Sequence, residues 1–206
     1  MKGFVKRWFD GPEQAAEPID AALEPGRRVY CIGDVHGRCD LLRELHEMIA
    51  ADARGFDGHR TVVYLGDLID RGMHSRDVVD LLLDEPLAGF ESVYLRGNHE
   101  QMMLDFIDAP AEMAARWLRF GGLQTLASFG IGGATETMGA TQANQVRDAL
   151  VEQLGPSMID WMWEMPSIHS SGNVHVVHAG ANPALPLEHQ SAHTLTCGHP
   201  DFERRV

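Results

Sequence analysis

The stretch TVVYLGDLIDRG, residues 61–72, sets a pattern that two other parts of the chain repeat. Its first five residues include four consecutive apolar ones, as expected for a strand that is covered on both faces. Its second half begins with glycine and carries two aspartates, and residues 75–85 then place apolar side chains at helical spacing. The stretch therefore predicts a buried strand, a glycine-led turn and a helix.

Two more units of the same kind lie on either side. VYCI, GDVHGR and CDLLRELHEMIAADA cover residues 29–53, and SVYLR, GNHEQ and MMLDFI cover residues 92–107. Three such units in succession predict an α/β fold with a layered core of sheet and helices. In the first helix, near-helical spacing predicts one buried face made of Leu41, Leu42, Leu45, Met48 and Ile49.

The remaining segments suggest how the domain is bounded. Residues 11–26 are rich in Pro, Gly, Ala and Glu, so we expect a leader and linker over residues 1–26 and a domain over residues 27–206. Residues 110 to about 165 contain helical stretches separated by FGIGGATETMG, which indicates a helical insertion. Strand character returns at NVHVVHAG, residues 173–180.

Charge and composition narrow the class of partner. Seventeen basic and thirty acidic residues give a net charge of −13, which opposes nucleic acid or an anionic membrane as a partner. Phosphate substrates stay allowed, because bound metal ions and a few arginines can dominate the field inside a cleft. Three scattered cysteines, no secretory leader and no long apolar run favour a cytoplasmic protein. The oligomeric state is left open.

The polar residues of the turns are suited to metal binding. Asp34 and His36 are two positions apart and point the same way if the strand continues, while Asp67 and Asn98 each follow an apolar strand. The carboxyl ends of strands in an open α/β sheet are where ligands bind. A single Asp after Gly is more often a turn former, but three similar turns together favour a site with oxygen and imidazole ligands.

These motifs resemble those of the phosphoprotein phosphatase family, in particular its bacterial serine/threonine phosphatases. GDVHG stands at 33–37, GDLIDRG at 66–72, GNHE at 97–100 and HAG at 178–180, and WLRFGGLQTLASFG at 117–130 is similar to a stretch of the bacterial members. The resemblance covers roughly residues 27–181. It implies a calcineurin-like metallophosphoesterase sandwich, with layered β-sheets flanked by helices.

The resemblance also implies a two-metal centre. Asp34 and His36 would bind the first ion, Asp67 would bridge both, and Asn98 and His178 would bind the second. Two divalent ions are expected, with manganese preferred and iron or zinc as alternatives.

Four further motif residues acquire roles by the same resemblance. Arg71 and Arg96 would hold the phosphate oxygens, and His99, oriented by Asp70, would protonate the leaving alkoxide. Family members carry another metal-binding histidine further downstream than His199, so the C-terminal part of the family domain is expected to be missing. His199 is left as a candidate for that sixth ligand.

The implied reaction is hydrolysis of phosphoserine and phosphothreonine in proteins by direct attack of a metal-activated water. Small phosphoesters are possible substrates as well. Two alternatives stay open: a hydrolase of dinucleoside polyphosphates on the same scaffold, and a non-catalytic remnant that binds metal or a phosphorylated partner.

Overall fold

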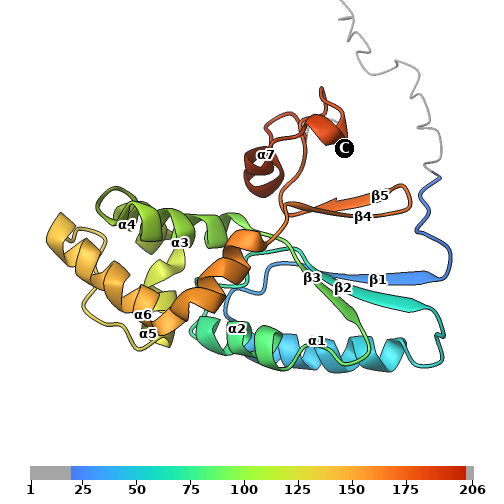
Figure 1. Ribbon diagram of the computed structural model, residues 1–206, viewed down its shortest axis with the longest axis horizontal. Coiled ribbons are helices and arrows are strands. Elements are labelled where there is room, and N and C mark those ends of the chain that lie inside the picture. The colour runs from blue at the N-terminus through green and yellow to red at the C-terminus, as the bar shows by residue number, and fades with distance from the viewer. Residues whose placement is uncertain (1–19, 203–206) are drawn as a thin grey trace, which may run out of the picture.

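The three repeated units form a parallel sheet with its connecting helices. The structure, a computed structural model, describes residues 20–202. Strands β1 (Arg27–Ile32), β2 (His59–Tyr64) and β3 (Glu91–Tyr94) are parallel and lie in that order. Helices α1 (Cys39–Asp52) and α2 (Ser75–Asp84) connect them and cover one face of the sheet (Figure 1). The predicted α/β core is confirmed.

A second layer lies on the other face of the parallel sheet. Strands β4 (Ile168–Ser171) and β5 (Val174–Val177) form an antiparallel hairpin there (Figure 1). Residues 20–24 run along its turn, where the backbone N–H of Ala22 donates to the side chain of Asn173 over 2.7 Å. Residues 1–19 of the expected leader lie outside the described residues.

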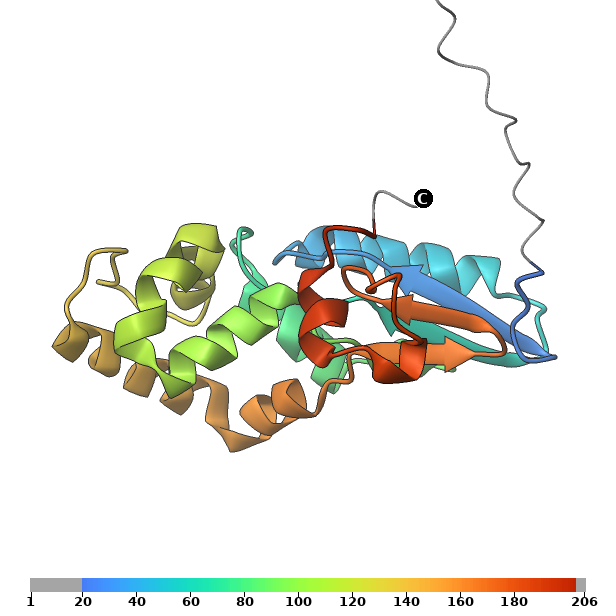
Figure 2. The same cartoon turned by 90° about the horizontal axis from the view of Figure 1, so that it is seen from above.

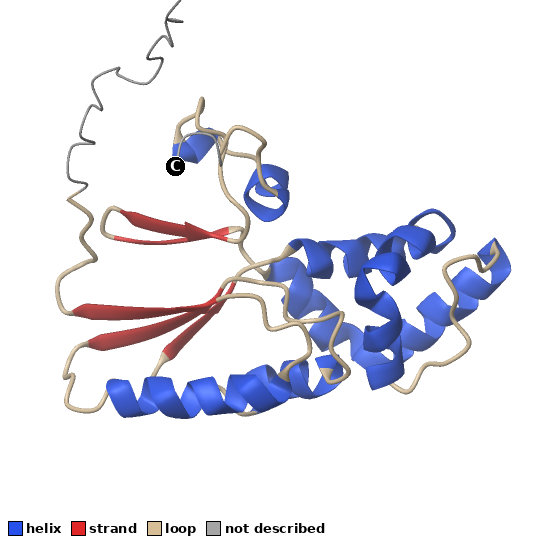
Figure 3. Ribbon diagram, turned by 180° about the vertical axis from the view of Figure 1, so that it is seen from behind, coloured by secondary structure: helices blue, strands red, loops and turns tan. Residues whose placement is uncertain are grey.

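Most of the helices stand beside the sheets, as Figures 2 and 3 show. This region contains α3 (Asn98–Asp108), α4 (Pro110–Trp117), a π-helical turn (Leu118–Gly122), α5 (Leu123–Ser128) and α6 (Ala140–Glu164). A short 3₁₀ turn (Leu187–His189) and α7 (Ala192–Cys197) end the described chain. Helices thus occupy residues 110–165, and their status as an insertion stays a prediction.

One hydrophobic core joins the sheet to the helical region. Its buried side chains come from β1, β2 and helices α1 to α6 and include Tyr64, Leu82, Phe106, Trp117 and Leu150. The continuity of this core means that residues from the helices can be held in fixed positions relative to the ends of the strands.

The predicted buried face of α1 is partly wrong. Leu42 and Ile49 are buried, but Leu41 is 48% exposed and Met48 is 66% exposed. Leu41 and Met48 are seven residues apart and lie on one side of the helix, about 100° around the axis from Leu42. The buried face instead includes His46, whose Nε2 is hydrogen-bonded to the Tyr64 hydroxyl over 2.8 Å.

No helix among residues 20–202 is long and apolar enough to cross a membrane. The cytoplasmic location stays a prediction.

Candidate metal centre

Two neighbouring loops at the carboxyl end of the parallel sheet are joined backbone to backbone. We call residues 33–38, after β1, the first loop and residues 66–72, after β2, the second loop. The N–H groups of Val35 and His36 donate to the carbonyl of Asp67 over 3.0 and 2.8 Å. Gly37 N–H donates to the carbonyl of Leu68, and Gly72 N–H donates to that of His36. The first loop therefore takes its shape from the second.

Asp34 and His36 come together through a turn and not through a continued strand. Strand β1 ends at Ile32, and His36 has a φ of +45°. The expectation that the strand continues through these residues was wrong. The tight turn nevertheless brings His36 Nε2 to 3.6 Å from a carboxylate oxygen of Asp34.

The second loop has an unusual backbone that a buried glutamate supports. Asp67, Asp70 and Arg71 all have positive φ, at +52°, +72° and +64°, which side chains other than glycine seldom adopt. The fully buried carboxylate of Glu100 accepts from the N–H groups of Asp67 and Leu68, both over 2.8 Å. It also accepts from Gly97 N–H over 3.0 Å, which ties the second loop to the start of α3.

The hydrogen bonds that hold the Glu100 carboxylate come from backbone N–H groups. Burial and the charge of Asp67 raise the pKa of Glu100 to about 7, although the backbone N–H groups favour its ionised form. Glu100 acts as a clamp because the fold brings the backbone N–H groups of residues 67, 68 and 97 around its side chain.

Two histidines are locked in the orientation that a metal ligand requires. Nδ1 of His36 lies 2.9 Å from the carbonyl of Ile69, and Nδ1 of His178 lies 2.8 Å from that of Leu65. A carbonyl only accepts, so each ring carries its proton on Nδ1 and presents a lone pair at Nε2. Such a backbone partner on the far nitrogen is typical of histidines that bind metal ions.

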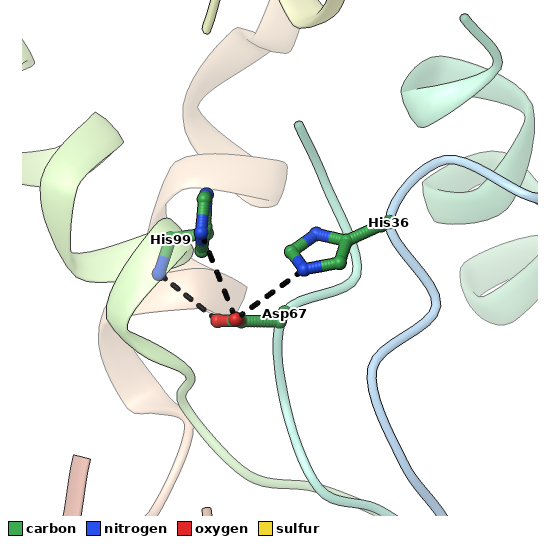
Figure 4. A group of neighbouring side chains, drawn as sticks. All are labelled: His36, Asp67 and His99. Atoms are coloured by element: carbon green, nitrogen blue, oxygen red, sulfur yellow. Dashed lines mark hydrogen bonds and ion pairs between the residues drawn. The ribbon is translucent and has the colours of Figure 1, made fainter. Parts of the chain in front are cut away.

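Both lone pairs are turned toward the carboxylate of Asp67. His36 Nε2 is 3.7 Å from one oxygen, and His178 Nε2 is 3.4 Å from the other (Figure 4 shows His36). His36 Nε2 is buried and has no hydrogen-bond partner. A buried nitrogen without a partner is costly, and a cation placed between it and the carboxylate would remove that cost.

The five predicted ligands gather around Asp67, which is nearly fully buried. Ligand atoms of Asp34, Asp67 and His178 all lie within 4.8 Å of one another. Asn98 Oδ1 is 3.1 Å from His178 Nε2, so that two electron-pair donors face each other. Oxygen and imidazole donors suit manganese, iron or zinc, and the residues present fit a metal pair. Their assignment as ligands stays a prediction.

His99 also lies next to Asp67 but has different partners. Its Nδ1 is 2.7 Å from the carboxylate of Asp70, and its Nε2 is 3.1 Å from the guanidinium of Arg71. Burial lowers the pKa of His99, but the Asp70 hydrogen bond and the charges of Asp67 and Asp70 outweigh burial, so its pKa is raised. The positive charge of the Arg71 guanidinium beside Nε2 disfavours a metal ion at that nitrogen. His99 is therefore better suited to transferring a proton than to binding a metal ion.

Arg96 is not brought into this cluster. Its guanidinium donates to the side chain of Gln101 over 3.2 Å and to the carbonyl of Trp163, and it lies 5.3 Å from the centre of the Trp163 ring. Burial lowers the pKa of Arg96. The predicted contact of Arg96 with phosphate therefore needs its guanidinium to leave these partners.

His199 is likewise separate from the cluster. Its Nδ1 accepts from the backbone N–H of Asp201 over 3.3 Å. Two groups of converging ligand atoms occur among residues 20–202, and neither includes His199: one is formed by Asp34, Asp67 and His178, and the other by His36, Asp67 and His99.

The sequence was compared with known protein families and with individual proteins. The sequence matches the pattern of the family described as Calcineurin-like phosphoesterase over residues 27–190. Serine/threonine-protein phosphatase 1 of Salmonella typhimurium is 34% identical over 113 residues, 54% of this chain and 45% of that protein. Serine/threonine-protein phosphatase BSL2 of Arabidopsis thaliana is 35% identical over 88 residues, 42% of this chain and 8% of that protein.

Two other similarities involve dinucleotide hydrolases. The symmetrical bis(5'-nucleosyl)-tetraphosphatase of Acidovorax ebreus is 26% identical over 170 residues, 80% of this chain and 48% of that protein. A crystal structure described as that of "a putative diadenosine tetraphosphatase" has a TM-score of 0.50 and 24% identity, covering 85% of this chain and 60% of that one. This structural likeness supports the fold alone. The chain spans less than half the length of these curated relatives.

Proposed function

The chain belongs to the calcineurin-like phosphoesterase family, and we propose that it hydrolyses phosphoserine and phosphothreonine monoesters of proteins at a two-metal centre. One observation carries this proposal. The rings of His36 and His178 are both fixed through Nδ1 by backbone carbonyls, and both turn Nε2 toward the buried carboxylate of Asp67. The two serine/threonine phosphatase relatives support the choice of substrate.

The converging residues suggest how two ions would be shared. Asp34, His36 and Asp67 would hold one ion, and Asp67, Asn98 and His178 would hold the other. When bound, such a pair supplies a water of lowered pKa and positive charge for the phosphate oxygens. Manganese is our first choice for both positions, with iron or zinc as alternatives.

The chain itself would supply the phosphate contact and the proton. Arg71 can donate two parallel hydrogen bonds to phosphate oxygens, as a planar guanidinium does. Without a substrate, Arg71 faces His99 Nε2 over 3.1 Å. When a phosphate oxygen accepts the hydrogen bond of Arg71 instead, His99 Nε2 would be free to carry a proton for the leaving oxygen. Asp70 would keep the His99 ring in place.

Hydrolysis of dinucleoside polyphosphates is the second candidate. The observation that favours it is the tetraphosphatase relative, which matches a longer part of this chain than the two protein phosphatases do. Both reactions need the same metal pair and the same arginine, so the residues described above serve either one.

The deciding experiment compares turnover with metal content. We expect manganese-dependent hydrolysis of para-nitrophenyl phosphate by the wild type, loss of that activity in Asp67→Asn, and retention in the control Asp57→Asn, whose carboxylate is exposed. A phosphothreonine peptide and diadenosine tetraphosphate are then offered in parallel. Turnover of the dinucleotide alone would reject the protein phosphatase. No turnover of any substrate, with fewer than two ions bound, would indicate the non-catalytic remnant.

A further inference from the structure

Within residues 20–202, the buried carboxylate of Asp70 forms an ion pair with His99 and none with Lys or Arg. Its exposed fraction is 0%, and a carboxylate in this position is costly unless hydrogen bonds satisfy both oxygens. Three donors do so. The Thr125 hydroxyl donates to Oδ1 over 2.6 Å, His99 Nδ1 donates to Oδ2 over 2.7 Å, and Trp117 Nε1 lies 3.2 and 3.0 Å from the two oxygens.

Thr125 holds the backbone of Asp70 as well as its side chain. Asp70 has a φ of +72°, and its N–H donates to the Thr125 hydroxyl over 2.9 Å and to the Ser75 hydroxyl over 3.1 Å. The same threonine oxygen thus accepts from the backbone of Asp70 and donates to its carboxylate. This arrangement fixes both ends of the aspartate with one fully buried side chain.

A kinked turn joins the two helices that carry the supporting residues. Trp117 ends α4, Thr125 lies in α5, and residues 118–122 form the turn between these helices. Gly121, at φ +116°, lies against the backbone of Arg71 and accepts its N–H over 3.3 Å. Gly121 thus marks a kink between two helices, and its positive φ allows the backbone to approach Arg71 closely.

From these contacts we propose that Trp117 and Thr125 are positioning residues, which hold Asp70 and through it fix the ring of His99 for proton transfer. This inference rests on the proposed function, because it assigns Trp117 of α4 and Thr125 of α5 a role in the same reaction. Both oxygens of Asp70 are held by residues other than His99, so the carboxylate keeps its orientation independently of that ring. Without the Thr125 hydroxyl, Oδ1 would retain only the longer Trp117 contact, and the carboxylate could rotate.

Comparing phenyl phosphate with para-nitrophenyl phosphate distinguishes a loss of His99 positioning from general damage to the active site. Phenoxide is a poor leaving group that needs a proton, whereas nitrophenoxide leaves readily without one. We expect Thr125→Val to lower kcat/KM for phenyl phosphate by about tenfold or more, a part of the ~10²–10⁴-fold contribution of a general acid. The nitrophenyl ester should lose only a fewfold. Trp117→Phe should change the ratio of the two rates in the same direction, and Thr125→Ser should restore it.

The matched control is Thr61→Val. Thr61 is also fully buried, and its hydroxyl donates to the carboxylate of Glu91 over 3.2 Å at the other end of β2. This variant removes one buried hydroxyl without touching Asp70, so the ratio of the two rates should equal that of the wild type. An equal loss on both esters in Thr125→Val, or the same change of ratio in Thr61→Val, would show that Thr125 serves packing alone.

A spectroscopic measurement tests the contact without turnover. In metal-free protein, the Nδ1 proton of His99 should give a downfield ¹H resonance that Asp70→Asn removes and Thr125→Val moves or broadens. An unchanged resonance in Thr125→Val would overturn the proposal. If the wild type hydrolysed neither ester, the proposed function would fail, while this resonance would still decide whether Thr125 positions the pair. Manganese bound per chain is measured in every variant, and it should not change in Thr125→Val.

Discussion

The first and second loops carry similar motifs but are supported in different ways. Both follow parallel strands, and both begin with Gly and Asp. In the second loop Asp67, Leu68 and Asp70 are buried, and side chains from α2, α3 and α5 bond its backbone. In the first loop the Asp34 side chain is 53% exposed, and the backbone leans on carbonyls of the second loop. The first loop therefore depends on the second for more backbone hydrogen bonds than it provides in return.

The position of each strand explains this difference. Strand β2 is paired with β1 on one side and β3 on the other, so the loop that follows it is enclosed by neighbouring loops and helices. Strand β1 is paired only with β2 among the described strands, and its loop has a side open to solvent. Removing a support of the second loop should therefore disturb both loops, whereas a change in the first should stay local.

The largest effect on stability is expected for Glu100→Gln, which removes hydrogen-bond acceptors of the second loop. The amide nitrogen of the glutamine would face backbone N–H groups that now donate to the Glu100 carboxylate. Each backbone N–H that loses its acceptor costs about 1–3 kcal/mol. We expect the free energy of unfolding of metal-free protein to fall by about 2–4 kcal/mol, measured with urea. Calorimetric titration should show weakened manganese binding at both ion positions.

Glu112→Gln is the control for this prediction. Glu112 is exposed on α4, so stability and metal binding should match those of the wild type. A Glu100→Gln protein with wild-type stability would mean that the second loop keeps its shape without the clamp.

A smaller and purely local effect is expected for Asp34→Asn in the first loop. The side chain is half exposed and supports no backbone group, so the stability of metal-free protein should change by less than about 0.5 kcal/mol. Manganese affinity should fall, because a neutral amide replaces a charged oxygen ligand. If this variant instead lowered stability as much as Glu100→Gln does, the first loop would be as important to the fold as the second, and the proposed difference between the loops would be refuted.

The smallest effect concerns α1, which follows the first loop and is joined to β2 by His46 and Tyr64. Burial and nearby Arg43 lower the pKa of His46 from its ordinary value of 6.5. As the pH drops below 6.5, the unfolded chain therefore binds more protons at this residue than the folded chain does. The free energy of unfolding decreases as the pH drops, until the pH reaches the lower pKa of the folded state.

We expect His46→Gln to reduce this acid sensitivity. The melting temperatures of wild type and variant are compared at pH values above and below 6.5, and the wild type should lose more on acidification. His193→Gln, which replaces an exposed histidine on α7, is the control. An equal loss in wild type and His46→Gln would show that other groups cause the acid sensitivity.

Some features of the fold and site could be predicted because they depend on local pattern. Apolar runs that end in Gly-Asp or Gly-Asn turns predict parallel strands, and parallel strands end at one edge of a sheet. That reasoning was enough to expect Asp34, Asp67 and Asn98 near one another, and the structure places them so. The resemblance added His178, which lies 80 positions from its neighbour Asn98.

Other features were hidden because contacts between distant residues decide them. Thr125 and Trp117 reach Asp70 from 55 and 47 positions away, and no local spacing links them to it. Arg96 follows a strand just before the GNHE motif, yet the carbonyl of Trp163, 67 positions away, holds its guanidinium outside the cluster. The sequence by itself determined the kind of ligands and the sheet edge where they meet, since side-chain chemistry and strand direction are local properties. Only the tertiary structure decided which buried side chains hold those ligands in place, because packing brings them together from separate elements.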